Sequence, residues 1–108
     1  MKKLLVILLV WMPAQYAAAG QSVEIGNLNT IQSEVLGEER SYFVGLPPSY
    51  HNTTYAPRRY PVLYIVDGSV SFQPAMGVTN HMSNPMNNGN IQIPEVIVVA
   101  IANTERCK

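Results

Sequence analysis

The chain is poor in the side chains that most often staple a small protein or bind a metal. It has one cysteine, Cys107, and two histidines among its 108 residues. A single thiol cannot close an internal disulfide, and no His, Cys or carboxylate cluster stands at the spacing of a metal site. We therefore expect neither a disulfide scaffold nor a metal centre, and no pattern in the sequence indicates another cofactor.

Charge is also scarce and evenly divided. Charged residues make up 13% of the chain, with seven basic and seven acidic side chains. Proteins that bind nucleic acids through the phosphate backbone need a basic patch or stripe, and none is present here. We therefore expect no nucleic-acid partner.

The amino terminus has the composition of a secretory signal peptide. Lys2 and Lys3 precede an apolar run, Leu4–Met12, and small residues follow at Ala17–Ala19. That run is far shorter than the roughly 20 residues that cross a bilayer, so a membrane anchor is the weaker interpretation. We expect cleavage near Ala19, export to the periplasm or beyond, and no stable membrane anchor.

Removal of residues 1–19 leaves 89 of the 108 residues, 20–108, for the folded part. Two β-rich runs open this part, Ile31–Leu36 and Ser41–Leu46, separated by the polar turn Gly37–Glu39. Such runs, joined by a short stretch that contains glycine, predict a β-hairpin. The more polar segment Ser22–Ile31 is interpreted as a lead-in or an edge strand.

Two further apolar runs do not alternate with polar residues. Tyr60–Val66 ends at Asp67-Gly68, and Glu95–Ala102 is rich in Val and Ile. Short β-branched runs of this kind are typical of strands buried on both faces of a sheet. The connection of about two dozen residues allows a right-handed crossover between parallel strands, with a short helix over 75–82. The sequence thus predicts an α/β protein with a mixed sheet.

Three segments carry a family resemblance: Arg40–Tyr50, Tyr60–Gly68 and Val98–Arg106. In this order and spacing they resemble a bacterial esterase group of the α/β-hydrolases that includes enterochelin-esterase-like, S-formylglutathione-hydrolase-like and mycolyltransferase-like proteins. The similarity spans residues 31–106. It implies the amino-terminal part of an α/β-hydrolase sheet, an exported serine ester hydrolase, and a small-molecule ester or thioester substrate.

The resemblance also implies one element of a catalytic site. Serine ester hydrolases of this fold stabilise the oxyanion with two backbone N–H groups, one of which comes from the loop after the third strand. The matching loop begins at Asp67-Gly68-Ser69. The Ser69 N–H is the candidate donor, with Asp67 and Gly68 shaping the turn. An ordinary Asp-Gly turn is the alternative.

The catalytic residues themselves are absent from the sequence. No Gly-x-Ser-x-Gly elbow is present, and the family's nucleophile, acid and His would all lie downstream of Lys108. His51 and His81 stand away from the family's catalytic-His position, so we interpret both as solvated side chains. We expect a truncated fragment that is inactive alone, with an open apolar strand edge at 96–102. A small exported β-rich binding module is the alternative.

Overall fold

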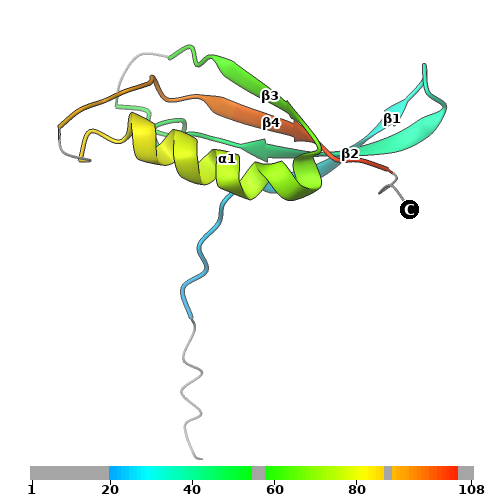
Figure 1. Ribbon diagram of the computed structural model, residues 1–108, viewed down its shortest axis with the longest axis horizontal. Coiled ribbons are helices and arrows are strands. Elements are labelled where there is room, and N and C mark those ends of the chain that lie inside the picture. The colour runs from blue at the N-terminus through cyan, green and yellow to red at the C-terminus, as the bar shows by residue number, and fades with distance from the viewer. Residues whose placement is uncertain (1–19, 55–57, 87–88, 105–108) are drawn as a thin grey trace, which may run out of the picture.

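The computed structural model describes residues 20–54, 58–86 and 89–104. The predicted signal peptide and the last four residues, with Cys107, lie outside these ranges. The described part forms one four-stranded sheet in the order β1-β2-β4-β3, with a single helix, α1, along it (Figure 1). The elements are β1 (Asn27–Ser33), β2 (Glu38–Gly45), β3 (Val62–Val66), α1 (Gly68–Ser83) and β4 (Ile97–Ile101).

The predicted hairpin is confirmed. β1 and β2 pair antiparallel, from Asn27 opposite Val44 to Ser33 opposite Glu38. The turn closes with a hydrogen bond of 2.9 Å from the Gly37 N–H to the Ser33 carbonyl, and Gly37 has a φ of 66°, which glycine adopts readily. β1 begins earlier than the run at Ile31 suggested, because backbone pairing with β2 continues through polar residues.

The predicted parallel pair is also confirmed. β3 and β4 run parallel, from Val62 opposite Ile97 to Val66 opposite Ile101, and α1 forms the crossover between them. Together with the antiparallel hairpin and the antiparallel pairing of β2 with β4, this gives the mixed α/β sheet that the sequence predicted.

The prediction about the open edge was wrong. β4 lies inside the described sheet between β2 and β3, and β3 is the edge strand (Figure 1). Tyr64 and Val66 are 71% and 78% exposed, so β3 is not buried on both faces by the described residues. The apolar composition of the two runs was correctly interpreted as strand, but composition does not say which of two parallel strands has a neighbour on each side.

Helix α1 is longer than the helix predicted over 75–82. It spans 16 residues and contains Pro74, which removes one backbone hydrogen bond. Its buried residues are Gly68, Phe72, Met76, Thr79 and Ser83. From Phe72 onward these follow the spacing of one helix face, so packing of that face on the sheet outweighs the cost of the proline.

The core lies between α1 and one face of the sheet. Phe72 and Met76 of α1 meet Val98 and Ala100 of β4, and Phe72 stacks on Phe43 with ring centroids 5.1 Å apart. Each large apolar side chain buried in this way contributes about 1.5–3 kcal/mol. Because the buried cluster of the described residues contains only these four side chains, the core is small and lies on one face of the sheet.

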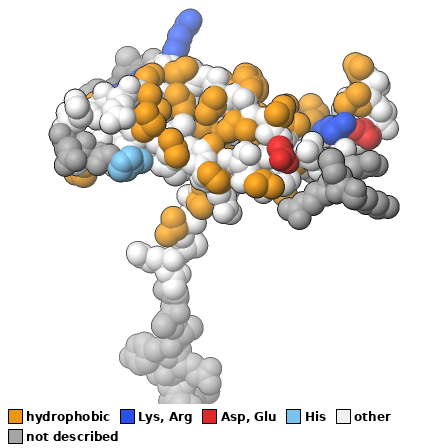
Figure 2. Space-filling view, viewed as in Figure 1, with side chains coloured by type: hydrophobic (Ala, Val, Ile, Leu, Met, Phe, Trp, Pro, Cys, Tyr) orange, Lys and Arg blue, Asp and Glu red, His pale blue; other side chains and the backbone are white. Residues whose placement is uncertain are grey.

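The other face of the sheet carries apolar side chains that α1 does not cover. Because side chains alternate along a strand, and Ile65 packs on the core, Val62, Tyr64 and Val66 point to the opposite face. All three are exposed, between 42% and 78%. On the side of the molecule that Figure 2 shows, which is the side seen in Figure 1, hydrophobic side chains are also widespread and charged ones are few.

Candidate functional site

The candidate site lies where β3 and β4 end side by side. Since the strands are parallel and Val66 is opposite Ile101, the residues that follow them lie together at the carboxyl ends of the strands, which we call the carboxyl edge of the sheet. Asp67 follows β3, and Asn103 lies just beyond β4. The Asn103 side-chain amide donates a hydrogen bond of 3.3 Å to Asp67 Oδ1. In open α/β sheets this carboxyl edge is where ligands bind.

Asp67 forms the turn from β3 into α1 with a left-handed backbone. Its φ and ψ are 60° and 45°, and it is the one non-glycine residue with positive φ in the described ranges. Its carbonyl accepts hydrogen bonds from the N–H groups of Val70 and Ser71, at 3.2 and 3.1 Å. The chain therefore turns directly from strand into helix, with no intervening loop.

Gly68 contributes to this turn through its missing side chain. The positive φ belongs to Asp67, whereas Gly68 is buried against β4. A Cβ on Gly68 would lie 2.7 Å from the backbone carbonyl carbon of Ala100. The absent side chain thus lets the first turn of α1 approach β4 closely, which fixes where the helix begins.

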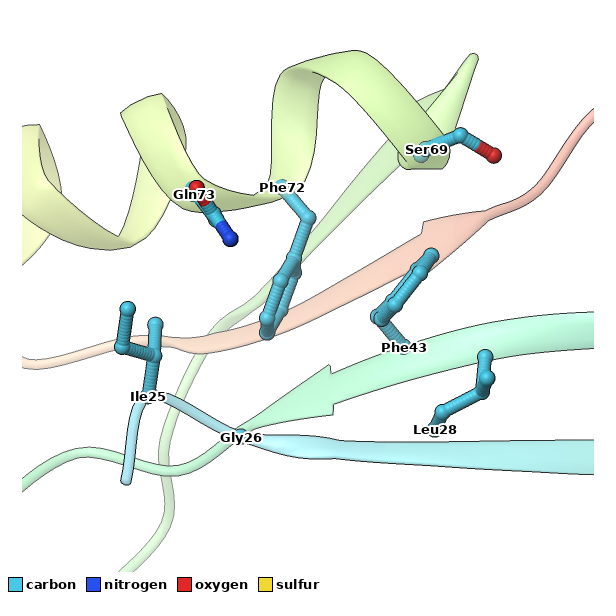
Figure 3. A pocket seen from close by; sticks show the side chains of 8 residues that line it. Ile25, Gly26, Leu28, Phe43, Ser69, Phe72 and Gln73 are labelled. Atoms are coloured by element: carbon cyan, nitrogen blue, oxygen red, sulfur yellow. The ribbon is translucent and has the colours of Figure 1, made fainter. Parts of the chain in front are cut away.

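Ser69 follows at the second position of α1. The first N–H groups of a helix have no acceptor within it, and they lie at the positive end of the helix dipole. The Ser69 backbone N–H therefore lies at the carboxyl end of β3. Its hydroxyl points away from Phe72 and Gln73 of the same helix (Figure 3).

A shallow cavity of about 220 Å³ lies beside this turn, between α1 and the start of β1. Phe72 and Gln73 project into it from α1 toward Ile25 and Phe43 (Figure 3). Its lining is completed by Gly26, Leu28, Gly68 and Ser69. The cavity is mostly apolar and shares only the first turn of α1 with the candidate site.

Neither histidine is close to this edge. His81 lies in the last turn of α1, 12 residues after Ser69, which corresponds to about 18 Å along the helix axis. His51 is exposed in the loop after β2 and packs edge-on against Tyr50. Because β2 runs antiparallel to β4, that loop lies at the opposite edge of the sheet. Neither side chain can therefore act as a base for chemistry at Ser69.

The opposite edge, where β3 and β4 begin, holds a set of polar residues that sequence reasoning did not identify. Ser49 donates from its backbone N–H to Glu95 Oε1 at 3.3 Å and from its hydroxyl to Glu95 Oε2. The same hydroxyl pairs with the Tyr60 hydroxyl at 2.8 Å, and Arg58 Nη1 lies 3.9 Å from Glu95 Oε2. We call Ser49, Arg58, Tyr60 and Glu95 the amino-edge cluster.

No protein-family model and no curated protein matches the chain. Solved structures do match, and three of them are described here. An IroE-like serine hydrolase from Shewanella oneidensis is 33% identical over 73% of this chain, with a TM-score of 0.63. The BES protein from Bacillus cereus is 19% identical over 82% of the chain, with a TM-score of 0.59. A ferulic acid esterase is 27% identical over 70%, with a TM-score of 0.52.

The chain spans only a fraction of each of these proteins. It covers 23% of the Shewanella hydrolase, 31% of the BES protein and 30% of the ferulic acid esterase. Its mixed sheet, its β3–α1–β4 crossover and its sequence similarity to the Shewanella hydrolase agree with one another. The chain therefore has the mixed sheet and one covering helix of an incomplete α/β-hydrolase fold, and the structures it resembles are esterase-type members of that family.

Proposed function

We propose that this chain is the amino-terminal part of an exported serine ester hydrolase and supplies one half of its oxyanion hole. The observation that carries this proposal is the turn at Asp67, which ends β3 and places the Ser69 N–H at the start of α1. Similarity to a serine hydrolase at 33% identity supports the choice of reaction.

The chemistry assigned to Ser69 uses its backbone alone. When a serine hydroxyl attacks an ester carbonyl, negative charge develops on the carbonyl oxygen. A fixed N–H group at a helix start stabilises that charge without having to reorganise. In this fold a second N–H, that of the residue after the nucleophile, completes the hole. We expect the nucleophile, its His and its acid to come from sequence beyond Lys108.

The proposed substrate class is a small-molecule ester or thioester. The described residues provide no charged side chain that points to a particular acyl or alcohol group, and the lining of the cavity beside α1 is mostly apolar. Recognition of the substrate is therefore assigned to residues outside the 108.

We also propose that the protein is exported after cleavage near Ala19. The support is the charge and apolar pattern of the first 19 residues. Within residues 20–54, 58–86 and 89–104, no helix is long and apolar enough to cross a membrane. Mass spectrometry of the periplasmic and secreted fractions tests this proposal, with an amino terminus at Gly20 expected. An intact amino terminus in the cytoplasmic fraction would contradict export.

The decisive experiment compares two polypeptides. The first is the 108-residue chain; the second is the product of the reading frame continued past codon 108, in frame or through a frameshift, to a Gly-x-Ser-x-Gly elbow. We expect the first to be inactive on p-nitrophenyl esters. The second should hydrolyse them and lose that activity to a serine-directed phosphonate. Inhibitor-sensitive turnover by the short chain, or no elbow downstream, would overturn the proposal.

The alternative of a small β-rich binding module is less well supported. A β-sandwich is built from antiparallel strands, whereas β3 and β4 are parallel and joined through a 16-residue helix. That arrangement is characteristic of α/β proteins.

A further inference from the structure

Asn103 is held in place at the end of β4 by contacts on both sides of it. The Ala102 N–H donates to the Ser41 carbonyl of β2 at 3.0 Å. On the other side, Arg40 Nη1 donates to Thr104 Oγ1 at 3.2 Å. The segment that carries Asn103 is thus fastened to β2, and its side chain reaches across to the Asp67 carboxylate of the neighbouring strand.

Asp67 does not behave as an aspartate at a helix start usually does. An N-cap aspartate normally has an extended backbone, and its carboxylate accepts a hydrogen bond from the second or third N–H of the helix. Asp67 instead has a left-handed backbone, and its carboxylate makes no capping hydrogen bond. The second N–H of α1 belongs to Ser69, so an ordinary cap would compete for the donor that the proposed oxyanion needs.

We propose that Asn103 is a positioning residue that holds the Asp67 carboxylate away from the Ser69 N–H. The inference rests on the proposed function, because it assigns a purpose to keeping that donor open. The left-handed conformation is unfavourable for a residue with a Cβ, and the hydrogen bond from Asn103 offsets part of that cost. Without this bond, Asp67 relaxes to the extended cap conformation and places an anion where the oxyanion must form.

This mechanism makes the effect of Asn103 conditional on Asp67. Glycine at position 67 would adopt the positive φ without steric cost and would bring no carboxylate to the helix start. Loss of the Asn103 amide should therefore matter when position 67 is Asp and cease to matter when it is Gly. A residue that only supported the fold would show no such dependence.

The test uses the polypeptide continued past codon 108, which we call the complete enzyme. It measures kcat and KM for an ester in this protein and in its Asn103→Leu, Asp67→Gly and double variants. We expect Asn103→Leu to lower kcat about 10- to 100-fold, with little change in KM, since a blocked oxyanion donor affects the transition state. In the Asp67→Gly background the same change should alter kcat less than about twofold. Asn80→Leu, on the exposed side of α1, is the matched control and should leave kcat unchanged.

An equal loss of kcat in both backgrounds, or no loss in either, would overturn the positioning role. Crystal structures of the wild type and of Asn103→Leu provide a readout that does not need activity. In the variant, an Asp67 carboxylate oxygen should lie within hydrogen-bond distance of the Ser69 or Val70 nitrogen. If Asp67 keeps its left-handed backbone there, the inference fails. If the complete protein hydrolyses no ester, the proposed function fails, and the structures still decide what Asn103 does.

Discussion

The two ends of the parallel pair β3–β4 both carry a carboxylate with partners from other segments, yet they are built differently. At the amino end, Glu95 accepts two hydrogen bonds from Ser49 and lies near Arg58, and Ser49 also pairs with Tyr60. At the carboxyl end, Asp67 has a left-handed backbone, and its carboxylate accepts from Asn103 while the helix start goes uncapped.

The amino end of the two strands therefore stabilises the fold, whereas the carboxyl end is arranged for the proposed reaction. The amino-edge cluster joins the segment after β2 to the starts of both parallel strands, so its hydrogen bonds contribute to stability. The carboxyl edge gives up a capping interaction worth about 1 kcal/mol and accepts an unfavourable backbone conformation. Strain of this kind is common at functional sites, where the surrounding structure has to maintain it.

The largest expected effect in the comparison of the two strand ends comes from removing the proposed oxyanion donor, the Ser69 backbone N–H. Ser69→Pro deletes the backbone N–H at a position in the first helical turn, where proline is tolerated. We expect kcat of the complete enzyme to fall about 10²- to 10³-fold, the usual cost of losing one oxyanion donor. Ser69→Ala keeps the N–H and should retain kcat. Equal losses in the two variants would assign the role to the hydroxyl and contradict the backbone mechanism.

The next largest effect is expected at the other end of the strands. Glu95→Ala leaves the Ser49 N–H and hydroxyl without their acceptor in a half-buried setting. We expect a loss of about 2 kcal/mol in the free energy of unfolding, because a hydrogen-bond donor that is shielded from water and has no acceptor is costly. Chemical denaturation measures this loss, and kcat of the folded variant should be unchanged. A fall in kcat without a loss of stability would mean that the two ends are not separate in function.

A smaller effect should follow from Tyr60→Phe. This change removes one hydrogen bond to Ser49 and keeps the ring that packs against Tyr50, with centroids 5.8 Å apart. The expected loss is about 1 kcal/mol, the net contribution of a typical hydrogen bond. Comparing denaturation midpoints with those of Glu95→Ala ranks the two partners of Ser49. A larger loss for Tyr60→Phe would make the tyrosine, and not the carboxylate, the centre of the amino-edge cluster.

Much of this fold could be predicted from the sequence, because its elements follow local patterns. The β-branched runs that became β3 and β4 have few alternatives, and Asp67-Gly68 marked the turn correctly. The helix predicted over 75–82 was too short, because α1 continues through Pro74, and the spacing of Phe72, Met76 and Thr79 already indicated one buried face.

The features that were missed depend on which segments lie next to one another. β3 is the edge strand of the described sheet because of the strand order, and no single run of residues determines that order. The hydrogen bond between Asn103 and Asp67 joins residues 36 positions apart, and the one between Ser49 and Glu95 joins residues 46 apart. Each arises only because parallel strands begin and end at common edges. The candidate site was therefore predicted as a turn, and its supporting contacts were not.

The smallest effect is expected for the stability of Asp67→Gly, and it tests whether the carboxyl edge is strained. Glycine relieves the cost of the left-handed backbone, but it loses the hydrogen bond from Asn103 and gains freedom in the unfolded chain. These contributions oppose each other, so the free energy of unfolding should change by less than about 1 kcal/mol. Loss of the Glu95 carboxylate has no such compensation. A loss for Asp67→Gly as large as that for Glu95→Ala would show that Asp67 holds the fold together as Glu95 does, and the contrast between the two ends would disappear.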